Sequence, residues 1–403
     1  MKLEIDLLEN RGVAGADYAG GGIFNLMQSI AQACGAPASD FAQCATLPAE
    51  RLAATRHLVL FVIDGLGLPA LAALPESSSL RRHRIGSLSS VFPSTTASAI
   101  TTFMTGLPPS QHALTGWHVQ LDEIDEMLAI LPMTVRGRRQ SPNEAAADAV
   151  ADLPPRLFPY RTVFQQMTRD SFIISPQHIA GSSFNAWHAR GATTCAYATL
   201  PDLFAQLGSL LSEAAAPRYI YAYFPDLDSA AHRFGCASEQ ALAVLSALDK
   251  AFDQFLADAA GADASVIVTA DHGFIDAPCE RVICLDDHPR LAGWLAHPLS
   301  GERRAAYCHV QPAHRDEFAD YVRENLAHAV ELHASADLID AGWFGPPPYS
   351  LRLAGRVGDY TLVMKDDWTI TDWLPGEKRY PLIGVHGGVS VEEMRVPLIE
   401  IRV

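Results

Sequence analysis

The stretch HLVLFVIDGLG, residues 57–67, places six consecutive apolar residues directly before Asp64 and Gly65. A short apolar run that ends at turn-forming residues is typical of a strand buried on both faces of a sheet. An Asp-Gly pair after such a strand is most often only a turn. The stretch therefore predicts a core strand, and the rest of the chain decides whether Asp64 has a further role.

Other apolar runs have the same character, and helical patterns separate them. These runs are SFIIS (171–175), YIYAYF (219–224) and SVIVTADHG (265–273), with VPLIEIRV (396–403) expected as a terminal strand. Apolar residues at spacings of three and four predict helices over 200–215 and over 238–260, where Ser238 can cap the helix. A third helical pattern, 97–106, ends in Gly. The alternation predicts an α/β fold: a doubly wound, mostly parallel central sheet with helices on both faces.

The composition changes in the last third of the chain. Residues 279–350 carry scattered Pro, His and Arg residues and end in GWFGPPPYS. We therefore expect 281–350 to form a smaller inserted cap, while 1–280 and 351–403 form the core.

The chain is acidic, with 30 Lys and Arg against 46 Asp and Glu among 403 residues, a net charge of −16. Without a basic run, we expect no binding to nucleic acid or to an anionic membrane. No segment approaches the roughly 20 apolar residues of a membrane span. Seven cysteines without a CxxC pair, and an N-terminus (MKLEIDLLEN) without an apolar signal core, predict a reduced, cytoplasmic protein.

Carboxylates and histidines follow the predicted strands. They are Asp64 after the first strand, Asp228 and His232 in PDLDSAAHRFG, Asp271 and His272 in VTADHGF, and His386 in the glycine-rich GVHGGVS. Taken singly, each is more often a turn residue or a structural histidine than a ligand. In a doubly wound sheet, however, ligands bind beyond the carboxyl ends of the strands, where these groups fall. Mixed carboxylate and imidazole groups suit zinc and neighbouring divalent ions, and six ligands suffice for two metals.

A hydroxyl cluster, Ser94-Thr95-Thr96, lies between Pro93 and a helical pattern. A hydroxyl at a helix N-terminus is commonly only a cap. The same position offers backbone N–H donors and the positive end of the helix dipole to a phosphate. A Thr hydroxyl becomes a useful nucleophile when a metal lowers its pKa, so both interpretations stay open at this point.

The ordered set of motifs resembles the alkaline phosphatase superfamily, and most closely its type I phosphodiesterase/nucleotide pyrophosphatase branch. The matching stretches are LFVIDGLG, FPSTTASAITTFMTGLPPSQHALTGW, FPDLDSAAHRFG, VTADHGF and GVHGGVS, which span residues 60–390. The resemblance implies an alkaline-phosphatase-like fold and a hydrolase of phosphoric ester or anhydride bonds. Its expected substrate is a small-molecule phosphate ester or nucleotide, attacked through a phospho-threonine intermediate at a two-metal site.

The resemblance also implies roles for individual residues. Thr96 matches the family's nucleophile, and Ser94 and Thr95 are its neighbours. One metal would be held by Asp64, Asp271, His272 and the Thr96 oxygen, and the other by Asp228, His232 and His386. The Asp-x-x-x-His spacing favours Asp228 over Asp226 as the ligand. Two divalent ions are expected, with zinc favoured and manganese or magnesium as alternatives.

One position departs from the family. Ala99 stands where nucleotide pyrophosphatases carry an Asn that helps to hold a phosphate oxygen. This puts the nucleotide substrate in doubt more than the reaction, so a phosphomonoesterase, a phosphonate hydrolase, a phosphomutase and a catalytically silent binding protein stay open. A formylglycine sulfatase is disfavoured because C-x-P-x-R is absent near Thr96. Asn185 and His188 are candidate substrate contacts, although an ordinary loop is the simpler interpretation.

Overall fold

The structure is a computed structural model that describes residues 14–137, 153–212, 216–377, 379 and 381–403. The N-terminal MKLEIDLLEN lies outside the described residues. All seven cysteines carry free thiols. Every described helix is too short or too polar to span a lipid bilayer. The cytoplasmic location stays a prediction.

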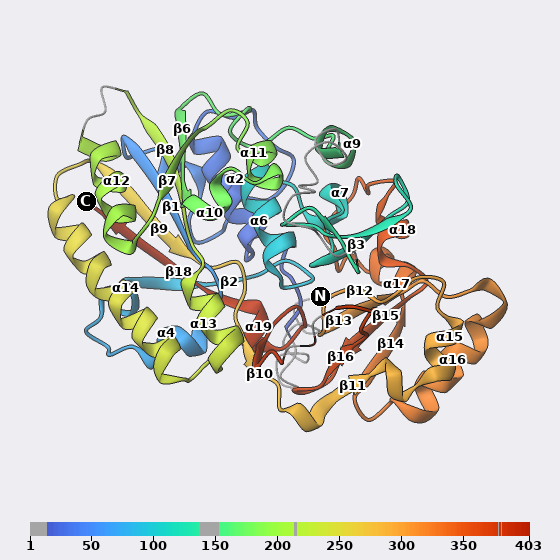
Figure 1. Ribbon diagram of the computed structural model, residues 1–403. Helices are drawn as coiled ribbons and strands as arrows, with labels where there is room; N and C mark the ends of the chain where they lie inside the picture. The colour runs from blue at the N-terminus through green and yellow to red at the C-terminus, as the bar shows by residue number, and fades with distance from the viewer. Residues whose placement is uncertain (1–13, 138–152, 213–215, 378, 380) are drawn as a thin grey trace.

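A seven-stranded central sheet forms the first part of the molecule (Figure 1). Its strands, in spatial order, are β2 (Arg84–Ser89), β18 (Arg395–Arg402), β9 (Ala264–Thr269), β1 (His57–Ile63), β8 (Arg218–Phe224), β6 (Asp170–Pro176) and β7 (Thr193–Tyr197). The strands from β9 to β7 are parallel, and β18 runs antiparallel to both β9 and β2. All seven residues of β1 are buried, as the apolar run predicts for a strand covered on both faces.

Helices cover both faces of this sheet, which confirms the predicted α/β architecture (Figure 1). One face carries α12 (Leu200–Ser212) and α14 (Glu239–Asp258), and the other carries α2 (Ile23–Ala33) and α6 (Thr96–Thr105). Phe61 of β1 packs against Phe204 of α12 and Phe252 of α14, with ring centroids 5.8 and 6.2 Å apart. The Ser238 hydroxyl caps α14 by accepting from the Ala241 N–H at 3.1 Å.

Shorter helices complete the central-sheet part. They are α3 (Ala49–Leu52), α4 (Leu68–Ala73), α5 (Ser79–Arg82), α7 (Pro109–His112), α9 (Leu153–Leu157), α10 (Gln177–Ala180), α11 (Ser183–His188), α13 (Asp226–Phe234) and α19 (Val391–Met394).

A second sheet, entirely antiparallel, lies beside the carboxyl ends of the parallel strands (Figure 1). Its order is β14 (Val330–Ala334), β15 (Tyr360–Met364), β13 (Ala305–Cys308), β12 (Ser300–Gly301), β3 (His118–Leu121), β4 (Glu126–Ala129) and β5 (Thr134–Val135). Helices α15 (Pro289–Trp294), α16 (Arg315–Asn325), α17 (Ser335–Asp340) and α18 (Leu353–Val357) pack around it. A separate apolar cluster that includes Leu291, Phe318 and Leu362 stabilises this part.

Two further sheets have two strands each. β10 (Ile275–Asp276) pairs with β17 (Gly384–Val385), and β11 (Val282–Cys284) pairs with β16 (Thr369–Thr371). The division into a cap at 281–350 and a core at 1–280 and 351–403 stays a prediction. The second sheet itself takes strands from both sides of the 281–350 range, namely β3 to β5 and β15.

Candidate active site

The predicted metal ligands lie where three neighbouring parallel strands end. β9, β1 and β8 are adjacent in the central sheet, and their carboxyl ends face the second sheet (Figure 1). Asp64 directly follows β1, while Asp271 and His272 follow the end of β9 by two and three residues. Asp228 and His232 lie on α13, which begins two residues after β8. Strand order therefore brings five distant residues to one edge of the sheet.

Helix α13 separates the two acids of PDLDSAAHRFG. Asp228 and His232 are one helical turn apart, and the Asp228 Oδ1 lies 3.3 Å from the His232 Nε2. Asp226 is exposed to solvent on a different face. The geometry thus brings Asp228, and not Asp226, to the other predicted ligands.

His386 reaches the same place from the end of the chain. Its ring stacks on that of His272, with centroids 3.7 Å apart and planes 16° apart. The loop can come this close because position 384 is glycine: a Cβ there would lie 2.5 Å from the backbone oxygen of Ala231 on α13. His232 stabilises the contact between α13 and the loop that carries His386, because its Nδ1 donates to the Gly384 carbonyl at 2.8 Å.

The six side chains form two overlapping groups. Potential ligand atoms of Asp64, Asp271 and His272 all lie within 4.8 Å of one another. Those of Asp228, His272 and His386 satisfy the same limit. His232 joins the second group, because its Nε2 lies 3.2 Å from the His386 Nε2.

Unpaired atoms in this cluster fit divalent cations. Asp64 Oδ1, Asp228 Oδ1 and Asp271 Oδ2 are buried without a hydrogen-bond partner, which is costly for a carboxylate unless a cation is present. His232, His272 and His386 each direct Nδ1 at a backbone carbonyl, at 2.8, 3.0 and 3.2 Å. Their Nε2 lone pairs therefore face the cluster, the arrangement by which proteins orient metal-binding histidines. The donor set suits zinc or a similar ion.

Burial and crowding shift the pKa values of these groups. Burial, followed by the charges of Asp271 and Asp228, raises the pKa of Asp64 well above its ordinary value. Burial and the neighbouring His272 and His232 lower the pKa of His386 well below its ordinary value. Burial alone would lower the pKa of His232, but the Asp228 carboxylate, the Gly384 carbonyl and the Glu302 carboxylate together raise that pKa. The cluster thus holds neutral His386 ready to bind a cation.

The three consecutive hydroxyls have three different partners. Ser94 donates to the Gly388 carbonyl at 2.8 Å, and Thr95 donates to the Glu302 carboxylate at 2.6 Å. Thr96, at the first position of α6, has its Oγ1 3.1 Å from the His272 Nε2. None of the three is used as a side-chain cap, since Thr95 occupies the N-cap position without capping the helix. Only the Thr96 hydroxyl contacts the ligand cluster.

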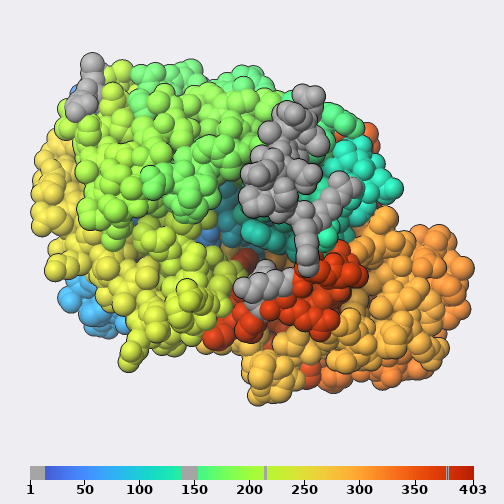
Figure 2. Space-filling model, in the orientation of Figure 1, coloured from blue at the N-terminus to red at the C-terminus, as the bar shows by residue number. Residues whose placement is uncertain are grey.

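Two cavities meet at Thr96 and Trp117, which line both of them. Figure 2 shows that the surface is hollowed between the two parts of the molecule. The polar cavity, of about 450 Å³, is lined by Thr96, Asp228, His232, His386, Glu302 and Arg136 among others. The apolar cavity, of about 440 Å³, is lined by Thr96, Ile100, Met104, Leu131, Phe184 and Tyr223 among others. The predicted second-metal ligands Asp228, His232 and His386 line only the polar cavity.

Two residues of the site were missed from the sequence. Tyr223 donates its hydroxyl to the Asp64 Oδ2, so a residue of the apolar YIYAYF run orients a predicted ligand. A tyrosine at the carboxyl end of a buried strand is the signal that could have indicated this. Glu302 lies on the turn between β12 and β13, and no local pattern marks it.

The other candidates take different places. Asn185 lines the apolar cavity and donates to the Ile179 carbonyl at 2.7 Å. His188 is buried, hydrogen-bonded to Tyr160 at 3.0 Å, and has a structural role. Ala99 is fully buried in α6 and brings no polar group to the site.

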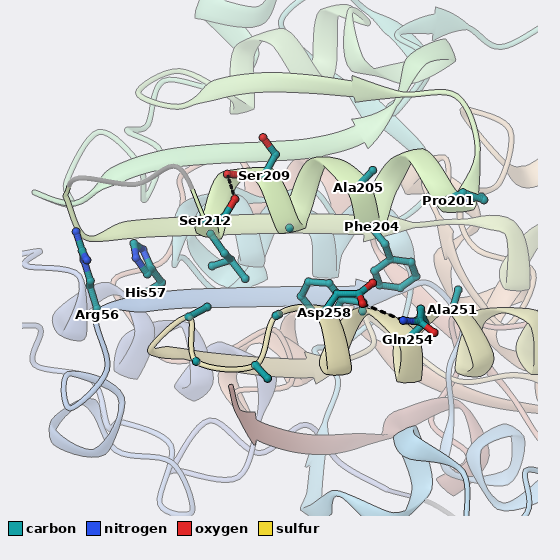
Figure 3. Close-up of a pocket in the computed structure, with 17 residues that line it drawn as sticks. Arg56, His57, Pro201, Phe204, Ala205, Ser209, Ser212, Ala251, Gln254 and Asp258 are labelled. Atoms are coloured by element: carbon teal, nitrogen blue, oxygen red, sulfur yellow. Dashed lines mark hydrogen bonds between the residues drawn. The ribbon is translucent and has the colours of Figure 1, made fainter.

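Another cavity, of about 810 Å³, lies at the opposite edge of the central sheet (Figure 3). Arg56 and His57 mark the amino end of β1 there, while Phe204 and Gln254 line it from α12 and α14. It contains none of the predicted ligands.

Comparison with known proteins points to one family. The profile of type I phosphodiesterase/nucleotide pyrophosphatase matches residues 58–388. The murine ectonucleotide pyrophosphatase/phosphodiesterase 5, as an inactive variant in complex with AMP, is 16% identical, with 85% of this chain and 87% of that chain covered and a TM-score of 0.62. Phosphonoacetate hydrolase from Sinorhizobium meliloti 1021, in complex with phosphonoformate, is 17% identical, with 87% and 91% covered and a TM-score of 0.59. These likenesses show a shared fold. No curated protein matches the sequence.

Proposed function

Because the chain belongs to the type I phosphodiesterase/nucleotide pyrophosphatase family, whose members hydrolyse phosphoester or pyrophosphate bonds, we propose that it is a phosphodiesterase with Thr96 as nucleophile. The Thr96 Oγ forms a bond to phosphorus while the bond from phosphorus to the leaving oxygen breaks. Water then cleaves the resulting phospho-threonine. Both displacements proceed in line: in the first, the leaving oxygen departs on the side away from Thr96, and in the second, water attacks from that side and the Thr96 Oγ is released.

The metal ligands in this proposal are those that the family resemblance implies. Asp64, Asp271, His272 and Thr96 would hold one divalent ion, and Asp228, His232 and His386 the other. When bound, the ions would neutralise the buried carboxylates, lower the pKa of the Thr96 hydroxyl and stabilise charge on the leaving oxygen. Zinc is the proposed metal, with manganese and magnesium as alternatives.

The two cavities that meet at Thr96 are the observation that favours a phosphate diester as the substrate. A phosphate diester has two substituents, whereas a monoester has one. The polar cavity contains Asp228, His232 and His386, so it fits the leaving substituent. The apolar cavity contains Ile100 and Phe184, so it fits a substituent that stays on phosphorus. A monoester would leave one of these cavities without a function.

A second candidate is a phosphonate hydrolase. Ala99 provides no side-chain amide to a phosphate oxygen, and the fold is shared with phosphonoacetate hydrolase. This candidate keeps Thr96 and the same ligands and differs only in the bond that breaks.

A substrate panel tests the proposal. Rates on bis-p-nitrophenyl phosphate, p-nitrophenyl phosphate and phosphonoacetate, each with zinc, manganese and magnesium in turn, are compared for the wild type and for Thr96→Ala. We expect the highest kcat/KM on the diester and no turnover by Thr96→Ala, whose metal ions should stay bound through the six remaining ligand side chains. A preference for the monoester would contradict the two-substituent argument, and near-normal turnover by Thr96→Ala would contradict the nucleophile.

A further inference from the structure

Glu302 lies at the junction of the two sheets, beside the proposed nucleophile. It is on the turn between β12 and β13, and its side chain lines the polar cavity together with Thr96 and His232. A carboxylate drawn toward the interior needs hydrogen-bond donors to compensate for lost hydration. Glu302 has two such donors, and both belong to the segment that carries Thr96 or follows it.

The first donor is Thr95, the residue directly before the nucleophile. Its hydroxyl donates to the Glu302 Oε1 at 2.6 Å. Thr95 occupies the N-cap position of α6, where a Thr side chain ordinarily bonds to the helix backbone, yet it makes no such bond here. The capping interaction is therefore replaced by a bond to the second sheet.

The second donor is the backbone N–H of Trp117, which reaches the same Oε1 at 2.6 Å. The segment between Thr95 and Trp117 contains α6 and α7, so one carboxylate oxygen ties both ends of it. Shared acceptance by a single oxygen fixes the position of that oxygen more tightly than one bond would.

The same turn also braces the loop that carries His386. A Cβ on Gly387 would lie 2.7 Å from the Glu302 Cβ, so loop and turn are in close contact. Two residues on, Arg304 pairs with Glu393 at 3.0 Å, and Glu393 accepts from the Gly388 N–H at 2.8 Å. The turn 302–304 is thus wedged between the nucleophile segment and a predicted ligand loop.

We propose that Glu302 is a positioning residue whose Oε1, through Thr95, holds the Thr96 hydroxyl in line for attack on phosphorus. The inference rests on the proposed function, because it takes Thr96 as the nucleophile. This role requires a hydrogen-bond acceptor oxygen at the position of the Glu302 Oε1, but it does not require the negative charge of the carboxylate. A misplacement of a reacting atom by about 1 Å can reduce the rate on the order of a hundredfold.

Matched variants distinguish the role of the Glu302 acceptor oxygen from the role of its negative charge. Glu302→Gln keeps an acceptor oxygen, whereas Glu302→Ala removes it. Thr95→Ser keeps the donor, whereas Thr95→Val removes it with little change in shape. On bis-p-nitrophenyl phosphate we expect Glu302→Gln and Thr95→Ser to keep kcat within about threefold. Glu302→Ala and Thr95→Val should each lower kcat on the order of a hundredfold, with KM and metal content nearly unchanged.

The double variant Thr95→Val/Glu302→Ala should be no slower than Glu302→Ala alone, because Glu302→Ala already removes the bond to Thr95. Three results would overturn the inference: Glu302→Gln as slow as Glu302→Ala, Thr95→Val as fast as wild type, or additive losses in the double variant. Thermal unfolding of each variant identifies misfolding, and Thr95→Val retains the test if Glu302→Ala does not fold. Turnover by Thr96→Ala would refute the proposed function instead, so the two failures are distinct.

Discussion

The buried carboxylates predict that Asp64→Asn stabilises the metal-free protein and destabilises the metal-bound protein. Asp64 and Asp271 have ligand atoms within 4.8 Å, and both are buried. Two unit charges at that distance repel by about 3 kcal/mol at an effective dielectric constant of about 20. Asp64→Asn removes this repulsion and keeps an oxygen that can accept the Tyr223 hydroxyl. The metal-free variant should therefore be more stable than the metal-free wild type.

The sign of the pH dependence follows from the raised pKa of Asp64, which is due to burial and then to the charges of Asp271 and Asp228. The folded protein holds this proton more tightly than the unfolded chain does. The stability from this group is fully present below the ordinary pKa and is lost as the pH rises through the folded-state pKa. The advantage of Asp64→Asn should therefore grow with rising pH.

Thermal unfolding in EDTA between pH 5 and pH 9 measures this advantage. Unfolding entropy of about 2.1 cal/mol/K per residue makes 3 kcal/mol equivalent to about 3–4 °C for a chain of this length. With zinc added, the order should reverse, because the variant lacks a ligand. Asp226→Asn, which changes an exposed acid on α13, is the control and should change neither the metal-free nor the zinc-bound unfolding temperature. A metal-free Asp64→Asn protein less stable than wild type at high pH would refute the reasoning.

Two further predictions concern residues that support the site. Arg304→Met leaves the Glu393 carboxylate buried without its cation, since both side chains are at most 1% exposed. Chemical denaturation should show a free energy of unfolding lower by about 3–5 kcal/mol. The double variant Arg304→Met/Glu393→Gln should recover most of this loss. An unchanged midpoint would contradict the importance of this pair. Tyr223→Phe removes the donor to Asp64 and should weaken metal affinity roughly 10–100-fold by titration, with little change in stability of the metal-free form. Equal affinities would show that Tyr223 does not orient the ligand.

The residues at the strand ends could be predicted because apolar runs mark the strands and because ligands bind beyond the carboxyl ends of parallel strands. Asp64 ends an apolar run, and Asp271 with His272 follows another. In a parallel sheet such positions share one edge, so their proximity needs no knowledge of loop paths. Because β9, β1 and β8 are adjacent in the sheet, the residues that follow these strands in the sequence lie close together in space.

The contribution of the second sheet could not be predicted in this way. β12 has two residues and touches β3 through the single pair Gly301 and His118, so neither strand is long enough to show a period. The partners Thr95 and Glu302 are 207 positions apart, and only the folded chain brings them together. Tyr223 was hidden for another reason: its ring fits an apolar strand while its hydroxyl serves the site.

The central claim is that Thr96 carries the phosphoryl group during turnover. Mass spectrometry of peptides from protein quenched in acid during turnover of bis-p-nitrophenyl phosphate tests this most directly. We predict a phosphodiester adduct on Thr96 in the wild type, with no adduct on Ser94 or Thr95. An adduct on another residue, or burst kinetics without any adduct at Thr96, would contradict the account.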